Sequence, residues 1–236
     1  MVSPDTIRTV VGTIGNMVSL IGMFLSPLPT FWRIWKKKSV EEFSPLPYLS
    51  MLMNCSLWIC YGIPIVHPNS TLVLTVNGTG FIIEFMYVAG FFMYSGGKSR
   101  RGVLLILLSE FTYIAIMLSL VLSLTHSLPR RSLIIGLHCV IGGTLPYISS
   151  LSIMKMVIKT KSVDFMSLPL SCAGFANGIC WTLYALLRFD PFILIPNGIG
   201  LFLATMQLIL YGIYYKSTQK QIEGRNNRSE NNIQMT

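Results

Sequence analysis

The fold is decided by residues 38–61, KSVEEFSPLPYLSMLMNCSLWICY, because they return as residues 161–184, KSVDFMSLPLSCAGFANGICWTLY. Both copies begin with Lys-Ser-Val, continue with an acid and keep a spacing of 123 residues. The pairs at this spacing include Ser44 and Ser167, Asn54 and Asn177, Trp58 and Trp181, and Tyr61 and Tyr184. Farther along, Asn77-Gly78-x-Gly80 returns 120 residues later as Asn197-Gly198-x-Gly200. The duplication predicts two similar halves packed around one central axis.

The chain carries too few charges for a soluble domain of its size. Hydrophobic residues make up 52% of its 236 residues and charged residues 11%, whereas a soluble domain has about a quarter charged residues. Apolar runs of about 20 residues, long enough to cross a bilayer as helices, separate the charges. We expect seven membrane helices, at about 7–29, 44–63, 70–94, 103–125, 132–154, 167–187 and 191–215. Together with the duplication, these helices favour a membrane transporter.

The placement of lysine and arginine predicts the orientation in the membrane. With the N-terminus outside, 14 of the 18 basic residues lie in cytoplasmic segments, and four lie on the other side: Arg8, Arg130, Arg131 and Arg188. We therefore expect an extracellular N-terminus and a cytoplasmic C-terminus, in the plasma membrane, with the vacuole or another internal membrane as the alternative. Basic loops also account for the net charge of +9 without any role in nucleic-acid binding.

The repeat predicts an all-α membrane protein with a 3+1+3 arrangement. Residues 6–95 form the first three-helix repeat, residues 132–215 the second, and residues 103–125 a linker helix between them. Three helices are an odd number, so the linker helix is needed to return the chain to the starting side. The two repeats are then parallel, and both KSV loops lie in the cytoplasm. Residues 216–236 are polar and are expected to be a disordered tail.

The order, spacing and duplication of these motifs resemble the plant SWEET sugar transporters, over nearly all of residues 6–215. Parallel repeats are the known architecture of that family. The resemblance implies passive, bidirectional transport of a mono- or disaccharide by alternating access, without a cofactor. Asn54 and Asn177 resemble the branch associated with hexoses such as glucose. We expect an oligomer, formed with further copies or with related transporters.

The duplicated residues are suited to a sugar pathway. Asn54, Trp58 and Tyr61 are spaced i, i+4 and i+7 and so share one helix face, which the second repeat reproduces. An amide donates and accepts hydrogen bonds without the desolvation cost of a charge, and an indole offers an apolar wall to a sugar ring. We therefore expect the substrate to be bound by Asn77, Asn197, Trp58, Trp181, Asn54 and Asn177. The resemblance adds Ser19.

The resemblance also implies gates and hinges. Tyr61 and Tyr184, one turn beyond the tryptophans, are expected to form an extracellular gate together with Asp190. Hinge prolines are expected near the cytoplasmic side, and Pro27 and Pro47 match this pattern in the first repeat. In the second repeat Ser150 and Ser167 occupy the expected positions, while the nearby prolines are Pro146 and Pro169. Either the hinges have shifted along their helices or the inner-gate motion is impaired.

Three other functions are alternatives to sugar uniport. A proton-coupled transporter of the PQ-loop type would use the intramembrane acid Glu84, but Pro-Gln is absent from both loops. A seven-helix receptor would not have duplicated halves. A transport-inactive subunit of a transporter oligomer would explain the displaced prolines. No enzyme is expected, since the chain has no GxSxG, HExxH or P-loop spacing. The five cysteines have no CxxC spacing, so no zinc site is expected.

Overall fold

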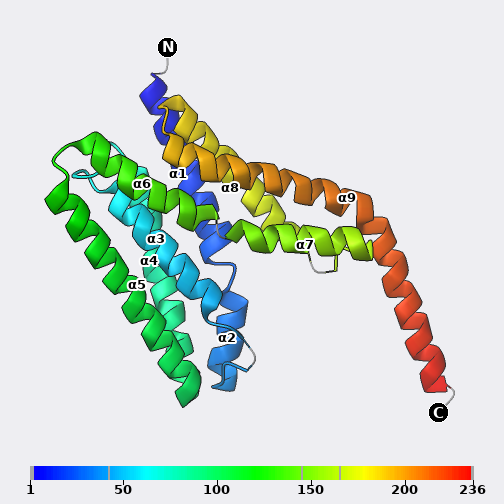
Figure 1. Cartoon of the computed structure of the whole chain (residues 1–236). Coiled ribbons are helices and arrows are strands. Elements are labelled where there is room, and N and C mark those ends of the chain that lie inside the picture. The colour runs from blue at the N-terminus through cyan, green and yellow to red at the C-terminus, as the bar shows by residue number, and fades with distance from the viewer. Residues whose placement is uncertain (1–2, 42, 145, 165, 235–236) are drawn as a thin grey trace.

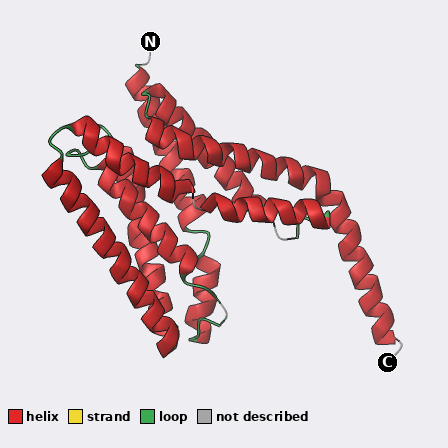
Figure 2. Ribbon diagram, in the orientation of Figure 1, coloured by secondary structure: helices red, strands yellow, loops and turns green. Residues whose placement is uncertain are grey.

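The computed structural model describes residues 3–41, 43–144, 146–164 and 166–234, and these residues form only helices and loops (Figures 1 and 2). The elements are α1 (Pro4–Ser19), the π-helix η1 (Leu20–Phe24), α2 (Leu28–Lys37), α3 (Leu46–Gly62), α4 (Thr71–Tyr94), α5 (Gly97–Leu124), α6 (Leu128–Thr144), α7 (Pro146–Thr160), α8 (Leu168–Leu187) and α9 (Pro191–Gln234). The expected all-α class with a 3+1+3 arrangement is confirmed. Helices α1 to α4 form the first repeat, α5 is the linker, and α6 to α9 form the second repeat.

Local signals in the sequence account for several helix ends. The Ser3 hydroxyl accepts a hydrogen bond from the Thr6 amide at 3.2 Å and caps α1. Ser167 caps α8 in the same way through the Leu170 amide, at 3.5 Å. After α2, Lys38 takes a left-handed conformation with φ 54°, and Lys161 after α7 takes one with φ 53°. The two KSV motifs therefore end equivalent helices in the same way.

Each repeat packs its first helix against the second helix of the other repeat. Helix α1 lies against α8, and α6 lies against α3. The largest core cluster accordingly draws on both repeats and includes Trp58, Tyr61, Trp181 and Tyr184. Two further clusters are separate: one around Ile34 and Phe91 in the first repeat, the other around Val157 and Leu203 in the second. The repeats share a core near the N-terminus and diverge toward the KSV loops (Figure 1).

Five helical segments in the described chain are long and apolar enough to cross a membrane: Pro4–Lys37, Thr71–Tyr94, Gly97–Leu124, Leu168–Leu187 and Pro191–Arg225. Helices α3 and α6 have 17 residues each, the lower end of the range of about 17–25 residues that spans a bilayer. The protein is a multi-pass membrane protein. The expected helix 7–29 instead continues to Lys37 through η1 and a turn, and the expected helix 132–154 is divided between α6 and α7.

The disordered tail expected at 216–236 is a wrong prediction for most of this segment, because α9 continues as a helix to Gln234. Its polar side chains find partners on the second KSV loop. The Thr218 hydroxyl accepts a hydrogen bond from the Val163 amide at 2.8 Å, and Arg225 pairs with Asp164 at 2.6 Å. The Gln221 amide donates to two carbonyls at the end of α7 and the loop after it, both at 3.3 Å. The polar composition therefore reflects docking onto a loop rather than a lack of structure.

The two KSV lysines make matching contacts. Lys38 Nζ lies 3.2 Å from the Tyr94 hydroxyl at the end of α4, and Lys161 Nζ lies 3.0 Å from the Tyr214 hydroxyl on α9. The two tyrosines are 120 residues apart, the same spacing as Asn77 and Asn197. Each KSV loop is thus tied to the third helix of its own repeat.

Candidate functional site

The duplicated aromatic residues lie on the second helix of each repeat. Asn54, Trp58 and Tyr61 lie on α3, and their repeat counterparts lie on α8. Trp58 and Tyr61 meet edge to face with ring centroids 5.6 Å apart, and Trp181 and Tyr184 meet in the same way at 5.2 Å. All four rings are buried in the core that the repeats share. The structure therefore brings the two expected aromatic walls into one region.

The asparagines of the Asn-Gly-x-Gly motifs are arranged identically on α4 and α9. The amide nitrogen of Asn77 donates to the Val73 carbonyl, and that of Asn197 donates to the Ile193 carbonyl, both at 2.8 Å. Each half-buried amide keeps a second N–H and its oxygen for another partner. These amides therefore have the chemistry to bind a ligand.

Ser19, at the end of α1, contacts two duplicated residues at once. Its hydroxyl donates to Asn177 Oδ1 at 2.6 Å and accepts from the Trp181 indole nitrogen at 3.1 Å. Ser19 is buried, so these bonds satisfy a polar group that would otherwise be costly inside the protein. On the other side, Asn54 Oδ1 is buried and has no hydrogen-bond partner in the described chain.

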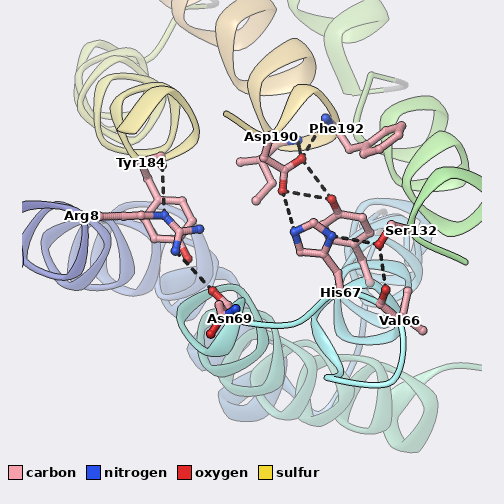
Figure 3. A network of polar contacts seen from close by, with 10 residues as sticks. Arg8, Val66, His67, Asn69, Ser132, Tyr184, Asp190 and Phe192 are labelled. Atoms are coloured by element: carbon pink, nitrogen blue, oxygen red, sulfur yellow. Dashed lines mark hydrogen bonds and ion pairs between the residues drawn. The ribbon is translucent and has the colours of Figure 1, made fainter. Parts of the chain in front are cut away.

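A polar network joins the repeats at the end of the shared core (Figure 3). The Tyr61 hydroxyl lies 3.0 and 2.9 Å from the two carboxylate oxygens of Asp190. His67 Nε2 lies 3.4 Å from the same carboxylate, and its other nitrogen lies 2.9 Å from the Ser132 hydroxyl. Asp190 also accepts from the amides of Phe192 and Ile193, which open α9. One carboxylate thus connects α3, the loop after it and α9, and His67 extends the network to α6.

Tyr184 is held differently from Tyr61. The Arg8 guanidinium lies 3.9 Å from the centre of the Tyr184 ring and donates to the Tyr184 carbonyl at 3.4 Å. It also donates to the Asn69 carbonyl at 3.3 Å (Figure 3). The predicted gate of Tyr61, Tyr184 and Asp190 did not include Arg8, His67 or Ser132. A charged residue within an apolar helix was a signal that could have singled out Arg8.

The His67 contacts predict a dependence of stability on pH. Burial lowers the pKa of His67, the Asp190 carboxylate raises it, and the Arg188 and Arg8 guanidinium groups lower it further, with a net lowering. The folded protein therefore binds this proton less readily than the unfolded chain, whose imidazole pKa is about 6.5. We expect stability to fall as the pH drops below about 6.5.

Thermal unfolding of the detergent-solubilised protein between about pH 5 and pH 8 tests this expectation. His67→Gln retains a donor toward Ser132 but does not titrate, so its unfolding temperature should depend less on pH. A slope in the His67→Gln variant as steep as in the unmodified protein would assign the effect to other groups.

The prolines occupy helix beginnings. Pro27 directly precedes α2, and Pro146 is the first residue of α7. Pro47 and Pro169 are each the second residue of their helix, α3 and α8. Proline is tolerated there, because an amide in the first turn has no partner within the helix. Pro47 and Pro169 therefore both lie in the first turn of a helix, and a hinge role for the four prolines stays a prediction.

Ser150 is the fifth residue of α7, where proline would have a different effect. It would remove the amide hydrogen that can bond to the first carbonyl of α7 and would bend the helix. We expect Ser150→Pro, alone and with Ser167→Pro, to raise the rate of sugar uptake severalfold if the bend assists the inner-gate motion. Ser152→Pro, on the same helix, is the control. Kinetics unchanged by Ser150→Pro, or changed equally by both substitutions, would remove this hinge hypothesis.

Glu84 on α4 is 3% exposed, and its Oε2 has no hydrogen-bond partner in the described chain. The position 120 residues later is Ala204, so the acid belongs to one repeat alone. No group of histidine, cysteine or acidic residues that could hold a metal ion occurs among the described residues.

Comparison with known proteins agrees with this arrangement. A family model described as "Sugar efflux transporter for intercellular exchange" matches residues 9–99 and 133–219, one segment in each repeat. The bidirectional sugar transporter SWEET4 of Oryza sativa subsp. japonica is 56% identical over 236 residues, which cover 100% of this chain and 91% of the relative. SWEET7 of Arabidopsis thaliana, also a bidirectional sugar transporter, is 52% identical over 225 residues, covering 95% and 87%.

A solved structure of a eukaryotic SWEET transporter has the same fold. It superposes with a TM-score of 0.86 at 36% sequence identity, over 90% of this chain and 99% of that one. The full-length sequence matches and the shared fold lead to one conclusion. The chain belongs to the SWEET family of sugar transporters and is a transporter rather than an enzyme.

Proposed function

We propose that this protein is a facilitative, bidirectional uniporter for hexoses such as glucose. The observation that carries the proposal is the duplicated set of uncharged amides and indoles between the two repeats. Among the described residues, Asn77 and Asn197 each use one N–H within their own helix and keep the other N–H and the oxygen for a ligand. Trp58 and Trp181 supply buried apolar walls. A neutral sugar needs both kinds of contact and no charged partner.

The packing of the repeats suits alternating access. The repeats share one core near the N-terminus, where the Asp190 network joins them, whereas each has its own core toward the KSV loops. In our proposal this is a state closed on the extracellular side, with Tyr61, Tyr184 and Asp190 in the outer gate. Movement of one repeat against the other would exchange the side that is closed. The proposed location is the plasma membrane with the C-terminus in the cytoplasm.

Uptake of labelled glucose into proteoliposomes, without any ion gradient, tests the proposal. We expect uptake down the glucose gradient in both directions, unaffected by a protonophore. Competition by unlabelled glucose, galactose, fructose and sucrose then tests the preference for hexoses. Competition by sucrose as strong as that by glucose would contradict hexose selectivity while leaving sugar transport intact. Folded protein that gives no uptake would favour a transport-inactive subunit.

Proton-coupled transport is the second candidate, and the buried, unpartnered oxygen of Glu84 is the observation that favours it. A proton carrier must exchange its proton between two sides, so a neutral substitute would abolish coupling. Uptake that requires a proton gradient and is lost in Glu84→Gln would replace passive uniport with this mechanism. Uptake unaffected by Glu84→Gln would leave Glu84 as a structural residue.

A further inference from the structure

In the structure, the number of residues that separates equivalent positions of the two repeats changes along the chain. The repeated sequence motifs alone do not reveal this change. A side chain at Gly80 would collide with Phe24, and one at Gly200 would collide with Tyr147, so Phe24 and Tyr147 are equivalent at a spacing of 123. A second pair of equivalent glycines lies before η1 in the first repeat. A side chain at Gly12 would collide with Leu72, and one at Gly136 with Phe192.

Leu72 and Phe192 are 120 residues apart, as are the two Asn-Gly-x-Gly motifs, so Gly12 and Gly136 are also equivalent. Their spacing is 124 rather than 123. The π-helix Leu20–Phe24 explains the difference, because a π-helix accommodates one additional residue. Before η1 the first repeat is therefore offset by 124 from the second.

With this correction, the counterpart of Ser19 is Gly143. The contacts agree. Ser19 lies against Asn177 and Trp181, whereas a Cβ atom at Gly143 would lie 3.8 Å from Asn54 Oδ1 and 3.9 Å from the Trp58 indole nitrogen. Each position thus faces the equivalent asparagine and tryptophan of the opposite repeat. In one half a hydroxyl is present, and in the other it is missing.

Among the described residues, the missing hydroxyl leaves two polar groups without hydrogen-bond partners. In the second repeat, Asn177 Oδ1 accepts from Ser19 and the Trp181 indole donates to it. In the first repeat, Asn54 Oδ1 is buried with no partner, and the Trp58 indole nitrogen donates no hydrogen bond within the described residues. A buried acceptor without a partner is costly, so this half of the site favours a ligand that supplies a hydroxyl.

The geometry points to an off-axis binding site in which one hydroxyl of the sugar takes the place of the missing serine hydroxyl beside Gly143. That hydroxyl donates to Asn54 Oδ1 and accepts from the Trp58 indole, as Ser19 does in the other half. Gly143 is then a specificity-determining residue, because its lack of a side chain makes this position available. This inference rests on the proposed function, and it names which half of the duplicated site the sugar hydroxyl enters.

The test compares the binding of glucose with that of glucose analogues lacking one hydroxyl each, by ligand-induced thermal stabilisation of the purified protein. In the unmodified protein, we expect one analogue to bind about tenfold more weakly than glucose, the effect of one lost hydrogen bond. Gly143→Ser should weaken glucose binding about tenfold and remove the difference between that analogue and glucose. A Cβ atom fits at Gly143, with its nearest neighbour at 3.5 Å, so the variant is expected to fold.

One variant serves as the comparison. Gly212→Ser adds the same side chain at a helix position bordered by open space and should bind like the unmodified protein. If glucose binds and is transported but Gly143→Ser changes neither affinity nor discrimination, the off-axis site is wrong and the proposed function stands. If folded protein binds no sugar, both the off-axis site and the proposed function are wrong.

Discussion

Proteoliposomes that contain the Asn77→Ala/Asn197→Ala double variant are expected to take up labelled glucose no faster than protein-free liposomes. Each amide uses one N–H on a carbonyl of its own helix and keeps the rest of its capacity for a ligand. Loss of substrate hydrogen bonds on both sides should remove about 2–3 kcal/mol of binding, or about 30- to 150-fold in affinity. The single variants should each retain measurable uptake at high glucose.

The double variant is expected to fold, because alanine has a higher helix propensity than asparagine and, among the described residues, each amide bonds only to its own helix. The control is Gln207→Ala, an amide on α9 whose oxygen accepts from Ser171 at 3.4 Å. It should transport at nearly the normal rate. Full uptake by the double variant, after its folding is checked, would show that the sugar is bound elsewhere.

The duplicated residues could be predicted because they are visible as a repeated spacing. Asn54, Trp58 and Tyr61 share a helix face by spacing alone, and the repeat implies a second face opposite the first. The structure places both sets of residues in one core. The division into three, one and three helices follows in the same way from the odd number of helices in each repeat.

The register of the repeats could not be predicted in this way. A π-helix has no strong sequence signature, so the extra residue in Leu20–Phe24 is visible only when the packing partners of the glycines are compared. The uncorrected spacing of 123 pairs Ser19 with Gly142 rather than Gly143. The asymmetry of the candidate site was therefore hidden.

The outer network was only partly predictable, for a different reason. Arg8 lies on α1, His67 in the loop between α3 and α4, and Ser132 on α6, and no sequence spacing relates these three residues. Only tertiary packing brings them together. The continuation of α9 beyond residue 216 depends in the same way on the second KSV loop, which supplies partners for its polar side chains.

Substitution of Asp190 by alanine is expected to have the largest effect on stability. The Asp190 carboxylate is 4% exposed, accepts from the buried Tyr61 hydroxyl and caps two amides of α9. Its loss leaves the hydroxyl without an acceptor and removes the cap, which should together cost about 2–4 kcal/mol. Asp190→Asn keeps an oxygen acceptor, and Tyr61→Phe keeps the cap, so each should cost less than Asp190→Ala.

Asp164→Ala is the matched control, because Asp164 pairs with Arg225 near the surface, where its side chain is 26% exposed. Such a pair is worth about 0–1 kcal/mol, so the control should unfold at nearly the normal temperature. If the network also holds the outer gate closed, Tyr61→Phe should increase labelling of a Ser19→Cys site by a membrane-impermeant thiol reagent added outside. A large loss of stability in Asp190→Ala without increased labelling in Tyr61→Phe would mean that the network supports the fold but does not gate the pathway. Increased labelling would show that one carboxylate both caps α9 and closes the extracellular side.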